Sequence, residues 1–185
     1  SALEVCDGID NNCDPTDGCG SVNGQEYTPV QGEEEAETFY DYGSGSPWTS
    51  STGYEQSNKT VIVVYVEPDG TTSLLMTHDI INDGSPGSVQ MTVSGAVGAE
   101  ILFFDDPFGN IDNYTFDSDT GEGAFTWSFG LSDGMIMGGF DGPFCVTFDV
   151  TASTGMDGYI IINQGGAPVE VDDYDAPLLV CGGGS

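Results

Sequence analysis

The sequence has almost no positive charge: its 185 residues include one lysine, Lys59, no arginine and one histidine, His78. Against these stand 31 Asp and Glu residues, which give a formal net charge of −30. Nucleic acid is excluded as a partner, because neutralising phosphates requires cationic side chains. The same shortage argues against binding to anionic membrane surfaces and against an enzyme that clamps an anionic substrate.

Long hydrophobic runs and helical periodicity are also missing. No apolar run approaches the roughly 20 residues that a transmembrane helix needs, so we expect no membrane insertion. No segment of ten or more residues repeats its apolar positions at helical spacing. Hydrophobic residues still make up 38 % of the chain, which is enough for a packed core and excludes a disordered acidic tail.

Short alternating segments take the place of helices. Val89–Ser94, Phe125–Phe129 and Phe144–Val150 alternate apolar and polar residues, which indicates strands with one buried face. Thr60–Val66 is apolar on both faces, as in a central strand. Further strands are expected at Gln25–Val30, Thr71–His78, Glu100–Phe104, Asn113–Asp117, Tyr159–Asn163, Pro168–Val171 and Leu178–Cys181. Roughly nine to eleven short strands predict an all-β protein, a single β-sandwich of immunoglobulin-like or jelly-roll kind.

Composition divides the chain into three parts. Residues 1–24 form a Cys- and Asp-rich loop, residues 25–58 a polar extended or loop segment, and residues 59–185 the sandwich.

The first part carries oxygen ligands at alternate positions. Asp10, Asn12 and Asp14 recur every second residue, and Asp7 and Asp17 flank them. Hard cations such as Ca²⁺ take six to eight oxygen ligands, and one short loop of this kind supplies several. The sequence therefore predicts a calcium site, with a solvated acidic loop closed by disulfides as the alternative. Zinc favours Cys-x-x-Cys spacing, whereas these cysteines are seven and six residues apart.

This segment resembles a cysteine- and aspartate-rich metal-binding motif of large secreted and surface proteins of bacteria and archaea. The motif reads E-x-C-D-G-x-D-N-D-C-D-G-x-x-D, and it is similar to the Asp-rich calcium repeats of thrombospondin. Eight residues match it: Glu4, Cys6, Asp7, Gly8, Asp10, Asn11, Cys13 and Asp14. Asn12 and Pro15 replace the usual Asp and Gly, and Asp17 comes one residue early. The resemblance implies secretion and cation binding.

Five cysteines, three of them in the first nineteen residues, favour an oxidising compartment and an extracellular or cell-surface location. We expect Cys6 to pair with Cys13, because a short bridge would hold the ligand loop closed. Cys145 alternates with apolar neighbours and so points away from the core. We expect it to pair with Cys181 or with Cys19.

Other acidic groups are candidates for further cation sites at loops of the sandwich. The strongest has Asp117, Asp119 and Glu122 at alternating spacing around a glycine. Asp105–Asp106 and the group Asp172, Asp173 and Asp175 are weaker. For each of them a solvated acidic turn is the simpler interpretation.

The remaining candidate functional residues are two glycosylation sequons, the single histidine and a group of aromatic residues. Asn58 and Asn113 are potential glycosylation sites. His78 has no nucleophile motif beside it, so we interpret it as structural or solvent-facing. Five aromatic residues occur in one polar stretch: Phe39, Tyr40, Tyr42, Trp48 and Tyr54. We expect them to pack over an open edge of the sandwich, with stacking on sugar rings as the alternative.

Together these features predict a non-enzymatic, extracellular, calcium-binding structural protein, a self-associating cell-surface or filament subunit. A carbohydrate-binding or adhesive module of a larger secreted protein is the alternative, and a secreted hydrolase is a third class. Thr60–Val66 and Tyr159–Ile162 carry no charge that would protect a sheet edge. We expect residues 1–58 or the strand Leu178–Cys181 to contribute to a calcium-dependent contact between copies.

Overall fold

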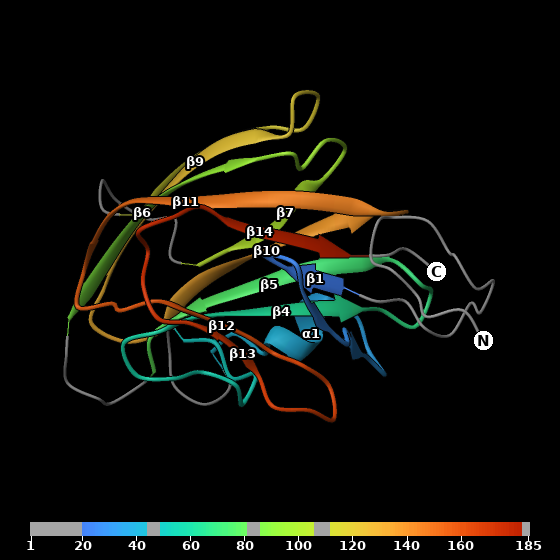
Figure 1. Ribbon diagram of the computed structural model, residues 1–185, viewed down its shortest axis with the longest axis horizontal. Coiled ribbons are helices and arrows are strands. Elements are labelled where there is room, and N and C mark those ends of the chain that lie inside the picture. Colours follow the sequence, from blue (N-terminus) through green and yellow to red (C-terminus); the bar gives the residue numbers. More distant parts are fainter. Residues whose placement is uncertain (1–19, 44–48, 81–85, 106–111, 183–185) are drawn as a thin grey trace.

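Two seven-stranded sheets pack face to face in the computed structural model, which describes residues 20–43, 49–80, 86–105 and 112–182. Figure 1 shows the two layers, with the single short helix α1 lying against the second of them. The all-β sandwich predicted from the sequence is confirmed.

The first sheet has the strand order β2-β1-β14-β11-β6-β9-β8, and its neighbouring strands are antiparallel. Its strands have these bounds: β1 Gly20–Val22, β2 Gln25–Tyr27, β6 Gly87–Ser94, β8 Asn113–Asp117, β9 Glu122–Phe129, β11 Phe144–Thr154 and β14 Leu178–Gly182. The edge strands of this sheet are therefore β2 and β8.

The second sheet has the order β13-β12-β4-β5-β10-β7, and β3 pairs in parallel with the far end of β4. Its strands have these bounds: β3 Val30–Gln31, β4 Thr60–Val66, β5 Thr72–His78, β7 Glu100–Phe104, β10 Asp133–Phe140, β12 Tyr159–Ile161 and β13 Val169–Val171. The β12–β4 pair is also parallel, and the ends of the sheet order are β13 and β7.

The main core fills the space between the sheets. Its largest buried side chain, Trp127, stacks on Phe125 and Phe104 and donates its indole N–H to the Gly134 carbonyl at 3.2 Å. This hydrogen bond links β9 of the first sheet to β10 of the second. The alternating residues of the strands supply the rest of the core, as their period of two requires.

A second apolar cluster covers the outer face of the second sheet. Strand β4 contributes to both clusters: Ile62 and Val64 face the first sheet, whereas Val61, Val63 and Tyr65 face outward. Helix α1 (Ala36–Tyr40) and the residues after it cover this outward face. The apolar character of β4 on both faces, which predicted a central strand, follows from this double packing.

The structure differs from the sequence-based division in two respects. Residues 20–58, which the sequence separates from the sandwich, contribute β1, β2, β3 and α1 to it. The fourteen described strands also exceed the seven to nine of an immunoglobulin fold and the eight of a jelly roll.

The described part of the chain contains no helix that is long and apolar enough to cross a membrane.

Candidate functional site

The predicted calcium loop lies outside the described residues. This applies to its ligands Asp7, Asp10, Asn12, Asp14 and Asp17, and equally to Cys6, Cys13 and Cys19. The site and its disulfide therefore stay predictions from the sequence.

The weaker candidate at Asp117, Asp119 and Glu122 forms the exposed turn between β8 and β9. Asp117 Oδ1 accepts hydrogen bonds from the backbone N–H of Asp119 at 2.9 Å and of Thr120 at 3.4 Å. Gly121 has a φ of +68° and packs closely against the backbone of Ala96 and Val97. The carboxylate of Asp117 thus stabilises the turn, which is the simpler of the two interpretations.

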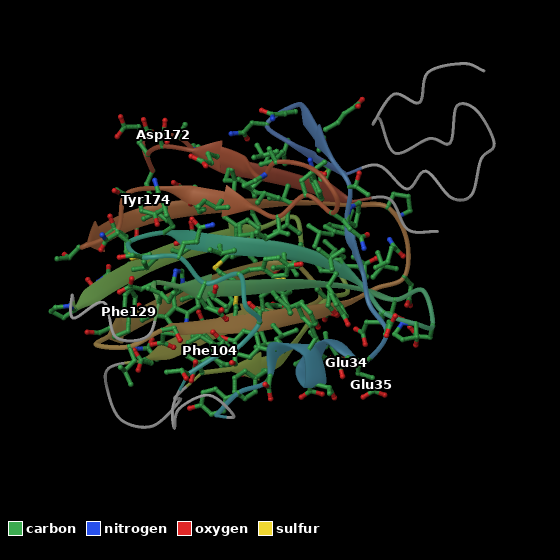
Figure 2. The ribbon with its side chains drawn as sticks, turned by 90° about the horizontal axis from the view of Figure 1, so that it is seen from below. Glu34, Glu35, Phe104, Phe129, Asp172 and Tyr174 are labelled. Carbon is green, nitrogen blue, oxygen red and sulfur yellow. A yellow bond between two sulfur atoms is a disulfide. The ribbon has the colours of Figure 1, made fainter. Side chains whose placement is uncertain are left out.

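The acidic groups of the described residues are dispersed. No group of three or more His, Cys, Asp or Glu side chains comes together within residues 20–43, 49–80, 86–105 and 112–182 in a way that could hold a metal ion. Asp172, Asp173 and Asp175 are exposed, and the Asp175 N–H is bonded to Asp173 Oδ1 at 3.2 Å. Figure 2 shows Asp172 at the outer surface, far from Glu34 and Glu35 beside α1.

Four aspartates are buried at one end of the sandwich. They are Asp79, Asp105, Asp112 and Asp133. One of them, Asp105, is named from the sequence with Asp106 as a weak cation candidate, but its burial is not anticipated, and Asp106 lies outside the described residues. Three of the four accept backbone hydrogen bonds: Asp79 from Asn58 at 2.9 Å, Asp112 from Ser128 at 2.7 Å, and Asp133 from Gly134 at 2.9 Å. Each lies where a strand begins or has just ended, so these carboxylates satisfy donors at strand ends. In the sequence, the only sign that these aspartates accept backbone hydrogen bonds is that turn residues lie beside them.

Asp105 lies on the outward side of the second sheet, near the hydroxyl of Tyr40. The backbone N–H of Asp105 is bonded to the Gly134 carbonyl at 3.0 Å. Burial, followed by the carboxylates of Asp105, Asp133 and Glu55, holds the pKa of Tyr40 well above its usual range. Tyr40 therefore stays a neutral phenol under all ordinary conditions.

His78, the one histidine, is fully buried at the same end of the sandwich. Its ring contacts Trp127 at a centroid distance of 4.5 Å and stacks on Phe129 at 5.9 Å. Thr60 Oγ1 lies 2.9 Å from His78 Nδ1 and 2.8 Å from the Tyr174 hydroxyl. Burial lowers the pKa of His78 to about 3. Of the two positions that the sequence left open for His78, solvent-facing is wrong, because the ring is buried, and its enclosure by aromatic rings agrees with the structural interpretation.

The aromatic residues of the polar segment cover the outer face of the second sheet, including its edge strand β7. Phe39 stacks on Tyr65 at 4.5 Å, and Tyr40 and Tyr42 contact Phe103 at 5.4 and 4.9 Å. Trp48 lies outside the described residues. Packing was the expected role of these rings. Tyr40 and Tyr42 pack against Phe103 of the edge strand β7, which agrees in part with the predicted edge location, whereas Phe39 packs on Tyr65 of the interior strand β4.

The disulfide between Cys145 and Cys181 is confirmed. The two residues are opposite each other in the register of β11 and β14, with a Cα–Cα distance of 4.0 Å. The bridge crosses two neighbouring strands on the solvent side of the first sheet. The sequence located it correctly because Cys145 alternates with the buried Val146 and the half-buried Phe144.

The two sequons differ in accessibility. Asn113 is exposed at the start of β8, whereas Asn58 is half-buried with a φ of +59°. The backbone N–H of Asn58 is bonded to Asp79, and its carbonyl accepts from Asp157. Of the two, Asn113 is the better acceptor for a glycan.

Of the segments predicted to contribute to a contact between copies, residues 1–58 contain the edge strand β2, whereas Leu178–Cys181 is interior. Strand β14 pairs with β1 on one side and β11 on the other, so Leu178–Cys181 offers no open edge. Strands β4 and β12 likewise have neighbours on both sides. Among the described strands, those with one neighbour and so open to strand addition are β2, β8, β13, β7 and the two-residue β3.

The single lysine forms the one ion pair found among the described residues. Lys59 Nζ lies 3.2 Å from Asp157 Oδ1 and donates to the Asp157 carbonyl at 3.1 Å. Asp157 is 67 % exposed, so this pair contributes little to stability. The remaining acidic groups have no basic side chain in the sequence to neutralise them.

Comparisons with known proteins give no match: no protein-family model, no curated protein and no solved structure corresponds to this chain.

Proposed function

We propose that this chain is a non-enzymatic, extracellular, calcium-binding structural protein that self-associates as a cell-surface or filament subunit. The observation that carries the proposal is the lack of internal counter-charge. The sequence has 31 acidic side chains against one lysine, and the described residues contain one ion pair, so cations from solution must offset the repulsion between the carboxylates. The ligand-rich residues 7–17 are the strongest calcium site that the sequence offers.

The buried polar groups support a structural role. His78, the usual candidate for a general base near neutral pH, is enclosed by aromatic rings with its pKa lowered to about 3. Three of the four buried aspartates accept backbone hydrogen bonds at strand ends. The chemistry that these groups perform is the stabilisation of the sandwich.

An extracellular location agrees with the cross-strand disulfide between Cys145 and Cys181. Structural disulfides persist in oxidising compartments, where calcium is also available at millimolar concentration. A fold stabilised by a disulfide and by bound cations suits a surface structure exposed to changing conditions.

Calorimetry of calcium binding tests the metal site. We expect saturable binding by the wild-type protein and its loss in the double variant Asp10→Ala/Asp14→Ala. The matched control is Asp141→Ala/Asp172→Ala, which removes the same charge from two exposed positions of the sandwich. Equal binding by both double variants would refute the site in residues 7–17.

Electron microscopy of the wild-type protein with and without calcium tests the structural role. Ordered assemblies that form only with calcium are the expected result. A protein that stays dispersed in calcium and instead binds glycans on an array would favour the carbohydrate-binding alternative.

A further inference from the structure

The four strands at the ends of the two sheet orders fall into two classes. Strands β2 and β13 have three residues each and carry Glu26 and Glu170 at their centres. Strands β7 and β8 have five residues each and carry an acidic residue only at one end, Glu100 and Asp117. Short length and central charge protect an edge against strand addition. By these criteria β2 and β13 are protected, whereas β7 and β8 are open.

The two open edges lie on the same side of the sandwich. The rings of Phe104 at the end of β7 and Tyr114 on β8 are 4.8 Å apart. Beside them the edges leave a groove of about 220 Å³, lined by Ala99, Glu100, Ile101, Tyr114, Phe116 and Ser118. The opposite side is closed by Thr28, which bonds to Asn163 and Gln164 as the chain passes from β2 to β3.

Exposed apolar side chains gather around the same two strands. Of the four large hydrophobic residues exposed in the described part of the chain, Leu102 lies on β7 and Tyr114 on β8. A third, Val97, lies in the turn between β6 and β7, whose backbone is bonded to the β8–β9 turn. Within the described residues, β7 and β8 have no outer strand partner, and the groove between them has a mixed polar and apolar lining. Strand addition is a way to cover such edges.

We propose that β8 pairs antiparallel with β8 of a second copy, around a two-fold axis at Thr115. This inference rests on the proposed self-association and names its surface. The pairing extends the first sheet from one copy into the other. Tyr114 and Phe116, which point toward the groove and contact Phe125, meet the same residues of the second copy across the axis.

The charges of β8 favour a second copy as the occupant. In an antiparallel register centred on Thr115, Asp117 of one copy lies opposite Asn113 of the other, and the amide of Asn113 is a donor for that carboxylate. Tyr114 lies opposite Phe116, an aromatic cross-strand pair of the stabilising kind. A parallel register would oppose Asp117 with Asp117. The strand is thus complementary to itself in one orientation only, and a two-fold interface requires this self-complementarity.

Calcium would promote this association by lowering the electrostatic repulsion between the two copies. Two copies at −30 each repel one another at low ionic strength, whereas the three central residues of β8 are neutral. Calcium that binds elsewhere on each copy lowers the long-range repulsion and leaves the neutral edge free to pair.

The variant Thr115→Lys tests the interface, with Thr92→Lys as a matched control. Thr115 and Thr92 are both exposed, and both pair with Ala124 of β9, one from each neighbouring strand. Thr115 lies on the edge strand β8, whereas Thr92 lies on the interior strand β6. Both variants reduce the net negative charge equally. Only Thr115→Lys opposes two ammonium groups at the axis. The protein is produced without glycosylation, because a glycan on Asn113 would occupy this edge.

Sedimentation velocity in millimolar calcium gives the readout. We expect Thr115→Lys to weaken self-association at least tenfold and Thr92→Lys to leave it within about twofold of the wild type. If the wild type associates and the two variants behave alike, the β8 interface is wrong and the proposed function stands. If the wild type stays monomeric, self-association itself fails, and the inference fails with it.

A second variant gives a direct contact. Thr115→Cys should form a disulfide-linked dimer under mild oxidation in calcium, since paired residues across a two-fold axis bring their Cβ atoms within bridging distance. Peptide mapping should recover the 115–115 bridge. The control Thr92→Cys should give no such bridge, and a 115–115 yield no higher than the 92–92 yield would overturn the proposed register.

Discussion

The hydroxyl of Tyr40 lies directly over Gly134, which pairs with Thr77 of β5 on one side and accepts the Asp105 N–H on the other. A Cβ at position 134 would collide with the Met76 carbonyl and with this hydroxyl. Glycine is therefore required here mainly by the close approach of the β5 backbone at Met76, with the Tyr40 hydroxyl of α1 as a second contact. The requirement explains why a strand buried on both faces contains a residue that disfavours strands.

We predict that Gly134→Ala lowers the free energy of unfolding by about 2–3 kcal/mol, because the added methyl group overpacks the contact with Tyr40 and Met76. Urea denaturation measures this as a lower midpoint with an unchanged slope. Gly130→Ala is the control, since a Cβ there meets no atom within 4 Å. A Gly134→Ala protein as stable as the control would show that Met76 of β5 and Tyr40 do not approach Gly134 as described.

His78 provides a second test at the residue scale. Its folded pKa of about 3 lies below the unfolded value of 6.5, so the unfolded state binds the proton more readily. The stability that its neutral form contributes is complete above pH 6.5 and is lost as the pH falls toward 3. Because the chain has one histidine, its NMR signal is unambiguous. We predict no titration in the folded protein between pH 5 and 8 and a transition near pH 6.5 in urea. A folded-state transition near pH 6.5 would mean that the ring is solvated.

At the scale of elements, the Cys145–Cys181 bridge ties β11 to β14, with a sequence separation of 36 residues. In the chain-entropy description, closing a loop of this length stabilises the fold by about 4 kcal/mol. We predict that Cys145→Ser/Cys181→Ser lowers the free energy of unfolding by up to this amount, as measured by urea denaturation. Peptide mapping of the unreduced wild type provides the control, and two free thiols at these positions would contradict the assigned pair.

The strands that could be predicted are those whose residues alternate clearly or are apolar on both faces. Thr60–Val66, Glu100–Phe104 and Asn113–Asp117 have the expected bounds. Strand β10 was missed, because Gly134, Gly138 and Gly139 interrupt its apolar residues and read as a turn. These glycines reflect contacts with Tyr40 and Leu102 and a φ of +86° at Gly139, which only the folded structure reveals.

Residues 20–58 were hard to predict for a different reason. Their strands have two or three residues, and α1 has five, so none is long enough to show a period. Their positions depend on tertiary contacts such as the hydrogen bond from the Tyr27 hydroxyl to the Cys181 carbonyl, across 154 residues. Sequence separation of this size leaves no local signal.

The candidate sites show the same contrast. Neighbouring residues of a strand face opposite sides of the sheet. Because Val146 faces the core, Cys145 faces solvent, and this predicted a disulfide on the solvent side. The buried aspartates at strand ends and the open edges at β7 and β8 could not be predicted, because burial and strand order depend on how distant segments pair.

At the scale of the whole molecule, the unbalanced charge is the dominant feature. Screening by any salt should raise stability, and a specific calcium site should raise it further. At a calcium concentration of 100 times the dissociation constant, binding adds about 2.7 kcal/mol, which corresponds to roughly 5–10 °C in Tm for a chain of this size. We predict a calcium-induced increase of this size above that of sodium chloride at equal ionic strength, measured by differential scanning calorimetry. Equal increases would indicate screening alone.

The proposed calcium-dependent self-association would depend on the net charge, on the predicted calcium loop and on the sheet edges at β7 and β8. Sedimentation velocity of the wild-type protein over a range of concentrations, in millimolar calcium and in sodium chloride of equal ionic strength, measures it directly. The expected result is a monomer in sodium chloride and, in calcium, a dimer or larger species whose fraction rises with protein concentration. A single monomeric species at every concentration in calcium, or the same association in both salts, would contradict a calcium-assembled structural protein.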